Sequence, residues 1–442
     1  MLDLEQLKVA VEEGTIDTVV VAFVDMQGRL MGKRVDGEYF LEHAGHGVDV
    51  CSSLITLDME SDITPGYEVS SIDTGYGDFA LRFDLATLRR IPWHEATALV
   101  LGDLTWHDGP PVNPAPRAVL KQQVERARAM GFEPAFGSEV EFFVCRETYD
   151  EVHAAGYARL TAAGRYVTDG HLLAPGFDEP LIAQLRRHMR VAGIPVEASK
   201  AEAWAGQHEV TFRYADPVTT ADNHAIFKHG AKEIAFQNGC SITFMAKPDH
   251  RWQGSSCHVH QSLWRDGTNA FAGESEVFQA YLAGQLACLR ELAVFVAPTV
   301  NSYKRFAVNT WAGTTLTWAH DNRTTGFRVV GRGDSLRVEA RIPGADVNPY
   351  LAPAALLAAG LYGIEHQLPL PPPYEGNAYA AEVERFPSAL REAITALERS
   401  TMARAALGDD VIDHYLNYAR TEQRLFDAVV TDYERERMFE RG

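Results

Sequence analysis

Acidic, imidazole and guanidinium side chains recur at a spacing of two residues in four segments of the sequence. Residues i and i+2 of a β-strand point to the same face. The sets that would share a face are Glu139 and Glu141 in residues 137–144, Glu209 and Arg213 in 206–214, His258, His260 and Ser262 in 254–263, and Arg337, Glu339 and Arg341 in 336–342. One such segment alone is typical of a strand with one solvated face. Glu139 and Glu141, however, precede Phe142 and Phe143, where uncompensated carboxylates would be costly to bury.

These residue types predict a site for cations and anions together. Two neighbouring carboxylates repel unless a cation lies between them. Carboxylate oxygens with an imidazole suit a hard divalent cation, Mg²⁺ or Mn²⁺, better than a zinc tetrahedron. The arginines indicate an anion on the same faces, such as a phosphate or a carboxylate. The combination suggests phosphoryl transfer, although no GxxxxGK[ST] loop occurs and Gly331-Arg332-Gly333 lacks the rest of a dinucleotide fingerprint.

The elements that would position these residues indicate an α+β protein. Short strands are predicted at residues 18–24, 29–34, 81–88 and 96–104. The proline-rich stretch 109–116 then marks a boundary, which predicts an N-terminal domain over residues 1–108 and a larger domain over 113–442. Helices are expected at residues 116–130, 181–191, 220–237, 276–295, 350–366 and 387–400.

Composition excludes several classes of protein. The chain has 442 residues, of which 46% are hydrophobic and 23% charged, as in ordinary globular proteins. Its net charge of −19 makes nucleic acid and anionic membrane surfaces poor partners. The N-terminus lacks a secretory pattern, and the apolar stretch 351–364 is shorter than the ~20 residues of a membrane span. Five scattered cysteines without a CxxC pair favour a reducing, cytoplasmic location.

Six motifs, in order, make the chain resemble the glutamine synthetase family over nearly its whole length. They are GSEVEFF from Gly137, AGQHEV from Ala205, GSSCHVHQSL from Gly254, NSYKRF from Asn301, DNRTTGFRVV from Asp321 and RVEARIPGADVNPYLAPAALLAAGLYGIE from Arg337. The likeness is greater to the branch that ligates organic amines to glutamate than to the enzymes that use ammonia.

The resemblance implies roles for individual residues. Metal ligands would be Glu141, Glu202 and Glu209 for one ion, and Glu139, His258 and Glu339 for a second. Glutamate would contact Gly254, Arg305 and Arg341, and the transferring phosphoryl group Arg323 and Arg328. Nucleotide contacts would be His260, Ser262 and Arg337, with Tyr214 near the adenine. Two to three Mg²⁺ or Mn²⁺ ions per active site and ATP as co-substrate are thereby expected.

The resemblance also implies a fold and a reaction. The expected architecture is an N-terminal β-grasp domain and a catalytic domain of curved sheet, or half-barrel, with helices. Family members stack as two hexameric rings, and a neighbour's N-terminal domain completes each active site. ATP would phosphorylate the γ-carboxyl of glutamate to γ-glutamyl phosphate, because a free carboxylate oxygen is a poor leaving group. An amine would then displace the phosphate.

Two departures from the family pattern fall where ammonia-using members bind ammonium. Val50 stands where those enzymes carry an aspartate, and Trp311 where they carry a glutamate. The substitutions leave a wider, more apolar pocket, in which Trp311 could hold an organic ammonium by cation–π attraction. An organic amine is therefore the predicted substrate. The alternatives are a true glutamine synthetase, with Asp49 caging the ammonium, and a non-catalytic structural or sensing relative.

Overall fold

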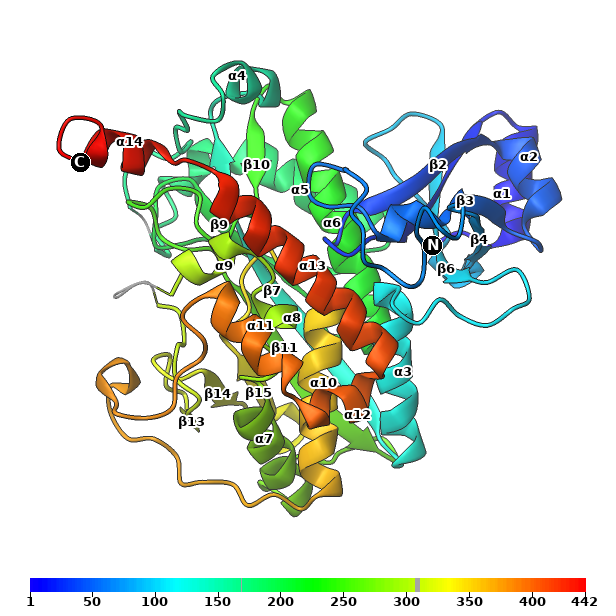
Figure 1. Ribbon diagram of the computed structural model, residues 1–442. Helices are drawn as coiled ribbons and strands as arrows, with labels where there is room; N and C mark the ends of the chain where they lie inside the picture. Colours follow the sequence, from blue (N-terminus) through cyan, green and yellow to red (C-terminus); the bar gives the residue numbers. More distant parts are fainter. Residues whose placement is uncertain (168, 307–310) are drawn as a thin grey trace.

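The computed structural model describes residues 1–167, 169–306 and 311–442 and contains two β-sheets (Figure 1). The N-terminal sheet has the order β2-β1-β6-β4-β3, with β5 beside β6. Its strands are β1 Thr18–Val24, β2 Leu30–Asp36, β3 Val48–Cys51, β4 Asp78–Phe83, β5 Arg89–Arg90 and β6 Thr97–Thr105. Two helices that the sequence analysis did not predict, α1 (Leu4–Glu12) and α2 (Gly37–His43), share an apolar core with this sheet.

The strand predicted over residues 81–88 is wrong in its second half. Strand β4 ends at Phe83, and residues Leu85–Thr87 form a 3₁₀ turn. The turn begins because the side chain of Asp84 accepts a hydrogen bond from the backbone N–H of Ala86. Such a local cap competes with the strand ladder.

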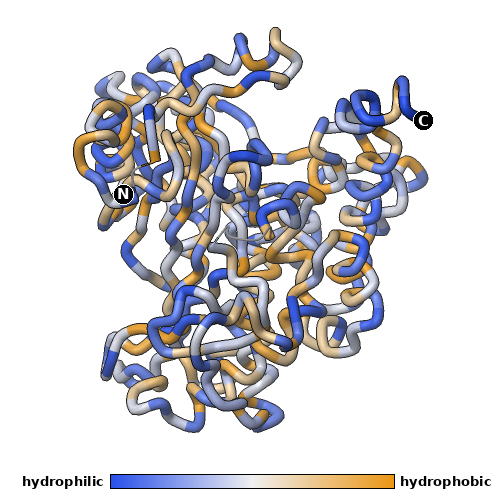
Figure 2. The backbone as a smooth tube through the Cα atoms, turned by 90° about the vertical axis from the view of Figure 1, so that its left-hand side faces the viewer, coloured by the Kyte–Doolittle hydropathy of each residue, from blue (hydrophilic) through white to orange (hydrophobic). Residues whose placement is uncertain are grey.

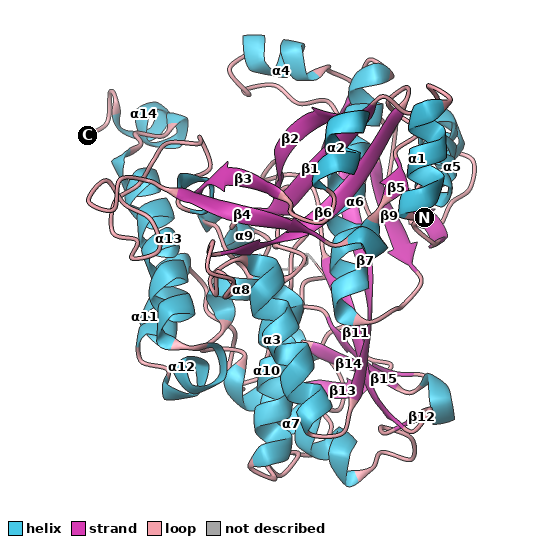
Figure 3. Cartoon of the chain, turned by 90° about the vertical axis from the view of Figure 1, so that its right-hand side faces the viewer, coloured by secondary structure: helices cyan, strands magenta, loops and turns pink. Residues whose placement is uncertain are grey.

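The second sheet has the order β13-β14-β15-β11-β7-β9-β8, with β10 beside β7 and β12 beside β11. Figure 3 shows its strands β7, β9 and β11 to β15. Its strands are β7 Glu133–Cys145, β8 Val196–Ala201, β9 Gln207–Phe212, β10 Ser241–Thr243, β11 Cys257–Arg265, β12 Thr268–Asn269, β13 Trp318–His320, β14 Phe327–Val330 and β15 Arg337–Ala340. The four segments singled out from the sequence thus lie on β7, β9, β11 and β15 of one sheet.

Helices cover this sheet and build the largest apolar core. They are α3 Pro116–Ala129, α4 Tyr149–Ala154, α5 Glu179–Val191, α6 Pro217–Gln237, α7 Glu276–Cys288, α8 Ala293–Val296, α9 Val300–Lys304, α10 Leu351–Glu365, α11 Leu390–Glu398, α12 Thr401–Leu407, α13 Asp409–Ala428 and α14 Asp432–Met438. Helix α10 is buried nearly all round. A side chain at Gly363 would lie 2.0 Å from the carbonyl oxygen of Ala280, so glycine lets α7 and α10 touch.

One predicted helix is divided in two, and one long helix was not predicted. The helix expected over residues 276–295 stops at Cys288, and α8 follows as a separate short helix. Helix α13, which the sequence analysis did not predict, packs against α11 (Figure 1). The hydrophilic helix α14 follows it, next to the C-terminus (Figure 2). Within the described ranges, every helix is too short or too polar to cross a membrane.

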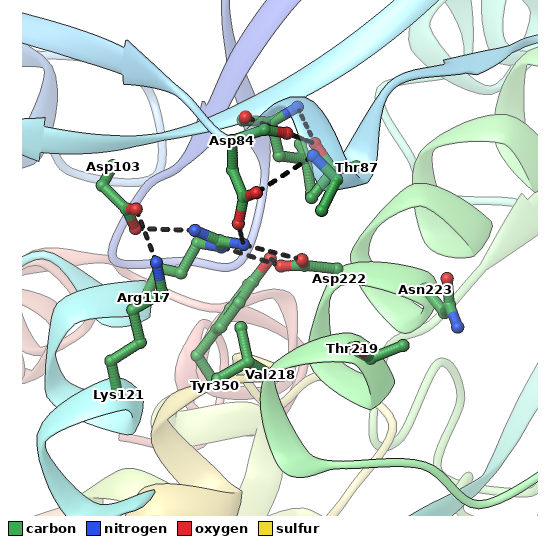
Figure 4. Close-up of polar contacts among 12 residues, drawn as sticks. Asp84, Thr87, Asp103, Arg117, Lys121, Val218, Thr219, Asp222, Asn223 and Tyr350 are labelled. Atoms are coloured by element: carbon green, nitrogen blue, oxygen red, sulfur yellow. Dashed lines mark hydrogen bonds and ion pairs between the residues drawn. The ribbon is translucent and has the colours of Figure 1, made fainter. Parts of the chain in front are cut away.

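A buried ion cluster joins the N-terminal sheet to the rest of the chain (Figure 4). Arg117 of α3 donates hydrogen bonds to Asp84 at 2.6 Å, to Asp103 at 2.7 Å and to Asp222 of α6 at 3.0 Å. The hydroxyl of Tyr350 donates to Asp222 at 2.6 Å. Asp84 and Asp103 lie in the N-terminal sheet and its connections, so one guanidinium bridges them to Asp222 of α6.

The buried His414 on helix α13 should make the folded state less stable at acidic pH. His414 contacts the sulfur of Met26 at 3.0 Å, and burial lowers its pKa to about 3. Below an unfolded-state pKa of about 6.5, the unfolded chain takes up a proton that the folded chain does not, so the free energy of unfolding falls as the pH falls. Between pH 7.5 and 5, the free energy of unfolding of wild type should fall by about 2 kcal/mol more than that of His414→Gln. Urea unfolding at each pH measures this difference.

The exposed His250 provides the control, since 87% of its side chain is accessible to solvent. His250→Gln should show the same pH dependence of the unfolding free energy as wild type. An equal pH dependence in wild type and His414→Gln would contradict the prediction.

Candidate active site

Three glutamates meet where β7 and β9 pair. Glu141 and Glu209 are directly opposite in the antiparallel register, and Glu202 follows β8. One carboxylate oxygen from each of the three lies within 4.8 Å of the others. The backbone N–H of Ser256 donates to Glu141 at 2.8 Å and the side-chain amide of Gln207 at 3.1 Å. Three carboxylates so close together form an oxygen-rich cluster suited to a hard divalent cation.

A second cluster surrounds Glu139, which lies two residues before Glu141 on β7 and on the same face of the strand. His258 of β11 faces Glu139 of β7, with its Nδ1 3.2 Å from Glu139 and 3.5 Å from Glu339. His260 Nε2 lies 3.1 Å from the other oxygen of Glu139. The three residues that the family resemblance assigned to a second ion therefore lie together, and His260 lies beside them.

The electrostatics of the two clusters differ. Burial, together with repulsion from the neighbouring carboxylates, raises the pKa of Glu209 to about 9 and that of Glu141 to about 7. Burial also acts on Glu339, but His258 and Arg341 outweigh it and lower its pKa to about 2. Hydrogen bonds from the two histidines likewise overcome burial and lower the pKa of Glu139. Without a metal, the first cluster therefore holds protons near neutral pH, whereas the second is anionic.

Guanidinium groups border the second cluster. Arg328 of β14 donates to Glu339 at 3.0 Å, and Arg341 also donates to Glu339. Arg305 lies deeper, donating to the carbonyl of Ile342 and to the hydroxyl of Ser256, each at 2.7 Å. A side chain at position 254 would lie 2.5 Å from Cγ of Arg305, so only glycine fits above that arginine.

One cavity of about 540 Å³, here called the active-site cavity, opens onto most of these groups. Its lining includes all six predicted metal ligands, with Gly254, Trp311, Arg323, Arg328 and Arg341. A second cavity of about 470 Å³, the nucleotide cavity, is lined by the four residues predicted to bind nucleotide, Tyr214, His260, Ser262 and Arg337. Glu139 lines both cavities, so they meet at that carboxylate.

Two predicted site residues line neither the active-site cavity nor the nucleotide cavity. Arg305 is buried behind Gly254 and Ser256. Val50 is 1% exposed and packs in the N-terminal core, pairing with Phe79 across β3 and β4. Strand alternation instead leaves its neighbours Asp49 and Cys51 exposed.

The structure adds residues that the sequence analysis missed. Lys200 and Asp169 line the active-site cavity, as do Gln207 and Ser256. Gln207 lies two positions before Glu209 on the same strand, so the alternation used for the glutamates could have found it. Strand alternation does not reveal the pairing of Asp169 with Lys200, because Asp169 lies in a loop that meets the edge strand β8 only in the folded chain.

Comparisons with known proteins find relatives that match this chain over nearly its whole length. The family model "Glutamine synthetase, catalytic domain" matches residues 113–438. The chain is 51% identical to gamma-glutamylethanolamide synthetase GlnA4 of Streptomyces coelicolor, covering 100% of this chain and 96% of that protein. It is 37% identical to glutamate–isopropylamine ligase of a Pseudomonas species, covering 96% and 95%. The solved GmaS/ADP complex superposes with a TM-score of 0.86 at 30% identity, covering 99% and 100%. The chain therefore belongs to the glutamine synthetase family.

Proposed function

We propose that this protein is an ATP-dependent ligase that joins the γ-carboxyl of glutamate to an organic amine and releases ADP and phosphate. The observation that carries the proposal is the full-length similarity to GlnA4, whose name states the synthesis of gamma-glutamylethanolamide. The second relative is likewise named for the ligation of glutamate to an alkylamine. The tryptophan in the active-site cavity supports an organic amine over ammonia.

Divalent cations fit the two carboxylate clusters. Glu141, Glu202 and Glu209 would hold one ion, and Glu139, His258 and Glu339 another, because these residues supply oxygens and one imidazole nitrogen at close range. Members of the glutamine synthetase family use ATP with such metals, and we propose Mg²⁺ or Mn²⁺, two to three per site. When bound, the ions supply positive charge that stabilises phosphate oxygens.

The chain's own residues position the substrates and stabilise developing charge. Arg341 and Gly254 bind glutamate, with the positive charge of Arg305 buried behind Gly254 and Ser256, while the nucleotide cavity receives ATP. A γ-carboxylate oxygen of glutamate attacks the γ-phosphorus of ATP, and ADP leaves. Arg323 and Arg328 stabilise the transferring phosphoryl group. The neutral amine then attacks the acyl carbon, phosphate departs, and the nitrogen loses one proton.

The direct test is a panel of amines incubated with the enzyme, ATP, Mg²⁺ and glutamate. Phosphate release should be faster with short monoamines than with ammonium, and mass spectrometry should detect the γ-glutamyl amide. Equal or faster turnover with ammonium would instead identify a glutamine synthetase. Absence of ADP formation with every amine and with ammonium would indicate a non-catalytic relative.

Trp311 should contribute to the selection of the amine. Its side chain lines the active-site cavity and is 56% exposed, so its ring face is available to an alkylammonium. Trp311→Ala should lower kcat/KM for monoamines about tenfold, the equivalent of ~1.4 kcal/mol of cation–π attraction, with a smaller effect on the KM for ATP. Trp106 lines neither cavity, and Trp106→Ala serves as the control. Unchanged monoamine kinetics in Trp311→Ala would refute this role.

Metal binding should release protons from the three-glutamate cluster. Without metal, burial and the neighbouring carboxylates raise the pKa of Glu209 to about 9 and that of Glu141 to about 7. Metal ligands must be deprotonated, so the apparent affinity for Mn²⁺ should rise between pH 6 and 9. Calorimetry in buffers of different ionisation enthalpy should detect about one proton released per subunit at pH 7.5. Glu209→Gln should abolish most of that release, whereas a pH-independent affinity would contradict the prediction.

Three further features are proposed from the family. The N-terminal sheet with its two helices, residues 1–108, forms a β-grasp domain that is distinct from a catalytic domain over 113–442. Twelve chains assemble as two hexameric rings, with each active site completed by a neighbour. The enzyme works in the cytoplasm, in keeping with five free cysteines.

A further inference from the structure

One wall of the active-site cavity is left for the amine. The nucleotide cavity joins the active-site cavity at Glu139, and the proposed glutamate contacts Gly254 and Arg341 form another side. The remaining lining includes Asp169, Lys200, Ala203 and Trp311. If glutamate and ATP occupy the first two sides, as the proposed function requires, the amine must approach along this third wall.

An alkylammonium of the protein itself lies at that wall. Nζ of Lys200 is 2.7 Å from a carboxylate oxygen of Glu202 and 3.6 Å from one of Asp169. Glu202 is already required for the three-glutamate cluster. Of these two carboxylates beside Lys200, Asp169 is therefore the one left to contact an amine, and the ammonium of Lys200 offsets its charge.

A third cavity of about 310 Å³ also has Lys200 in its lining, so this side chain borders both spaces. This cavity also contains Arg186 of α5. Glu179 is the one carboxylate among the described residues that line it, and both of its oxygens accept hydrogen bonds from Arg186. A substituent that passes Lys200 thus meets a second fixed cation and a carboxylate that is already paired.

We propose that Lys200 makes the enzyme selective for the charge of the amine's substituent, so that monoamines are accepted and diamines are discriminated against. The attacking nitrogen must be neutral, but the far nitrogen of a diamine is protonated at neutral pH. That second ammonium would lie close to Lys200 and find no unpaired carboxylate among the described residues of this wall and of the third cavity. Repulsion between like charges at such range, in a partly buried site, corresponds to about ten- to a hundredfold in kcat/KM.

The test compares two amines with the same four-carbon chain, butylamine and 1,4-diaminobutane, in the presence of ATP, Mg²⁺ and glutamate. The readout is the ratio of kcat/KM for the monoamine to that for the diamine. Lys200 contacts Glu202, so Lys200→Met is expected to lower the rates with both amines through the metal site. Taking the ratio removes this shared effect and leaves the effect on amine selectivity. Wild type should favour butylamine at least about tenfold.

The variants separate a charge effect from a structural one. Lys200→Met should bring the ratio close to one, because Asp169 is then free to accept the second ammonium. Lys200→Arg keeps the charge and should keep the preference. Asp169→Asn leaves the charge of Lys200 less compensated and should raise the ratio, which provides a second test if Lys200→Met folds poorly. Lys8→Met, on the exposed side of α1, is the matched control.

Several outcomes would overturn the proposal. A wild-type ratio near one would do so, as would a ratio that Lys200→Met and Asp169→Asn leave unchanged while amines are still turned over. Equal losses for both amines in Lys200→Met would mean that Lys200 only supports Glu202. A wild-type enzyme that turns over ethanolamine but neither four-carbon amine would overturn this inference alone, whereas one that turns over no amine at all would overturn the proposed function as well.

Discussion

Replacing Arg328 with alanine is expected to lower kcat by about 10³- to 10⁵-fold, the contribution of an arginine that stabilises a transferring phosphoryl group. Arg328 lines the active-site cavity and is held between two carboxylates, donating to Asp321 and Glu339 at 3.0 Å each. These contacts keep its guanidinium in place without substrate. The planar fork suits phosphate oxygens, so Arg328→Lys should recover only part of the activity.

The loss must be separated from damage to the metal site, because Glu339 is a proposed metal ligand. Mn²⁺ affinity and ADP binding should change far less than kcat in Arg328→Ala, measured by calorimetry and by single-turnover kinetics. Arg332, exposed beyond the end of β14, provides the matched control, and Arg332→Ala should remain near wild type. A loss below about tenfold in Arg328→Ala with normal metal affinity would exclude a role in phosphoryl transfer.

Replacing Arg117 with methionine should lower the free energy of unfolding by about 3–5 kcal/mol, the cost of leaving a buried charge uncompensated. The substitution keeps the length of the side chain but removes the donors that reach three aspartates. Asp222 would suffer most, because 4% of its side chain is exposed and the hydroxyl of Tyr350 would be its one remaining described hydrogen-bond donor, with Arg89 the nearby cation. Urea unfolding should show the loss.

Arg128 is the control on the same helix. Its ion pairs with Glu125 and Glu133 lie at the surface, so Arg128→Met should cost less than about 1 kcal/mol. Adding Asp222→Asn to Arg117→Met should recover part of the stability, because the orphaned charge is then absent. Equal, small losses in Arg117→Met and Arg128→Met would show that the cluster contributes little.

Local periodicity was sufficient to find much of the candidate site. The spacing of Glu139 and Glu141, and of His258 and His260, predicts one shared strand face, and the cavities lie on that face. Glu202 was predicted only from the family resemblance. It follows the end of β8, and its position in the sequence does not show which strand it faces. Which glutamate faces which histidine depends on the pairing of β7 with β11, which spacing within one strand does not determine.

Other features depend on contacts between residues far apart in the sequence. Asp169 and Lys200 meet because the backbone N–H of Asp169 donates to the carbonyl of Glu202, placing the loop over β8. The burial of Val50 follows from the packing of β3 on the N-terminal core. Helix α13 is different, since Val411, Tyr415 and Ala419 recur every four residues and an amphipathic helix could have been predicted there.

Strand β7 borders both substrate cavities, with Gly137 in one, Glu141 in the other and Glu139 in each. A slip of one residue against β11 would place Ser138 or Val140 opposite His258 and turn both glutamates to the far side of the sheet. Such an error would abolish nucleotide binding, metal binding and acyl transfer together. Misassembled molecules would thus be wholly inert rather than partly competent, and a titration of active sites after refolding would count the correctly assembled chains.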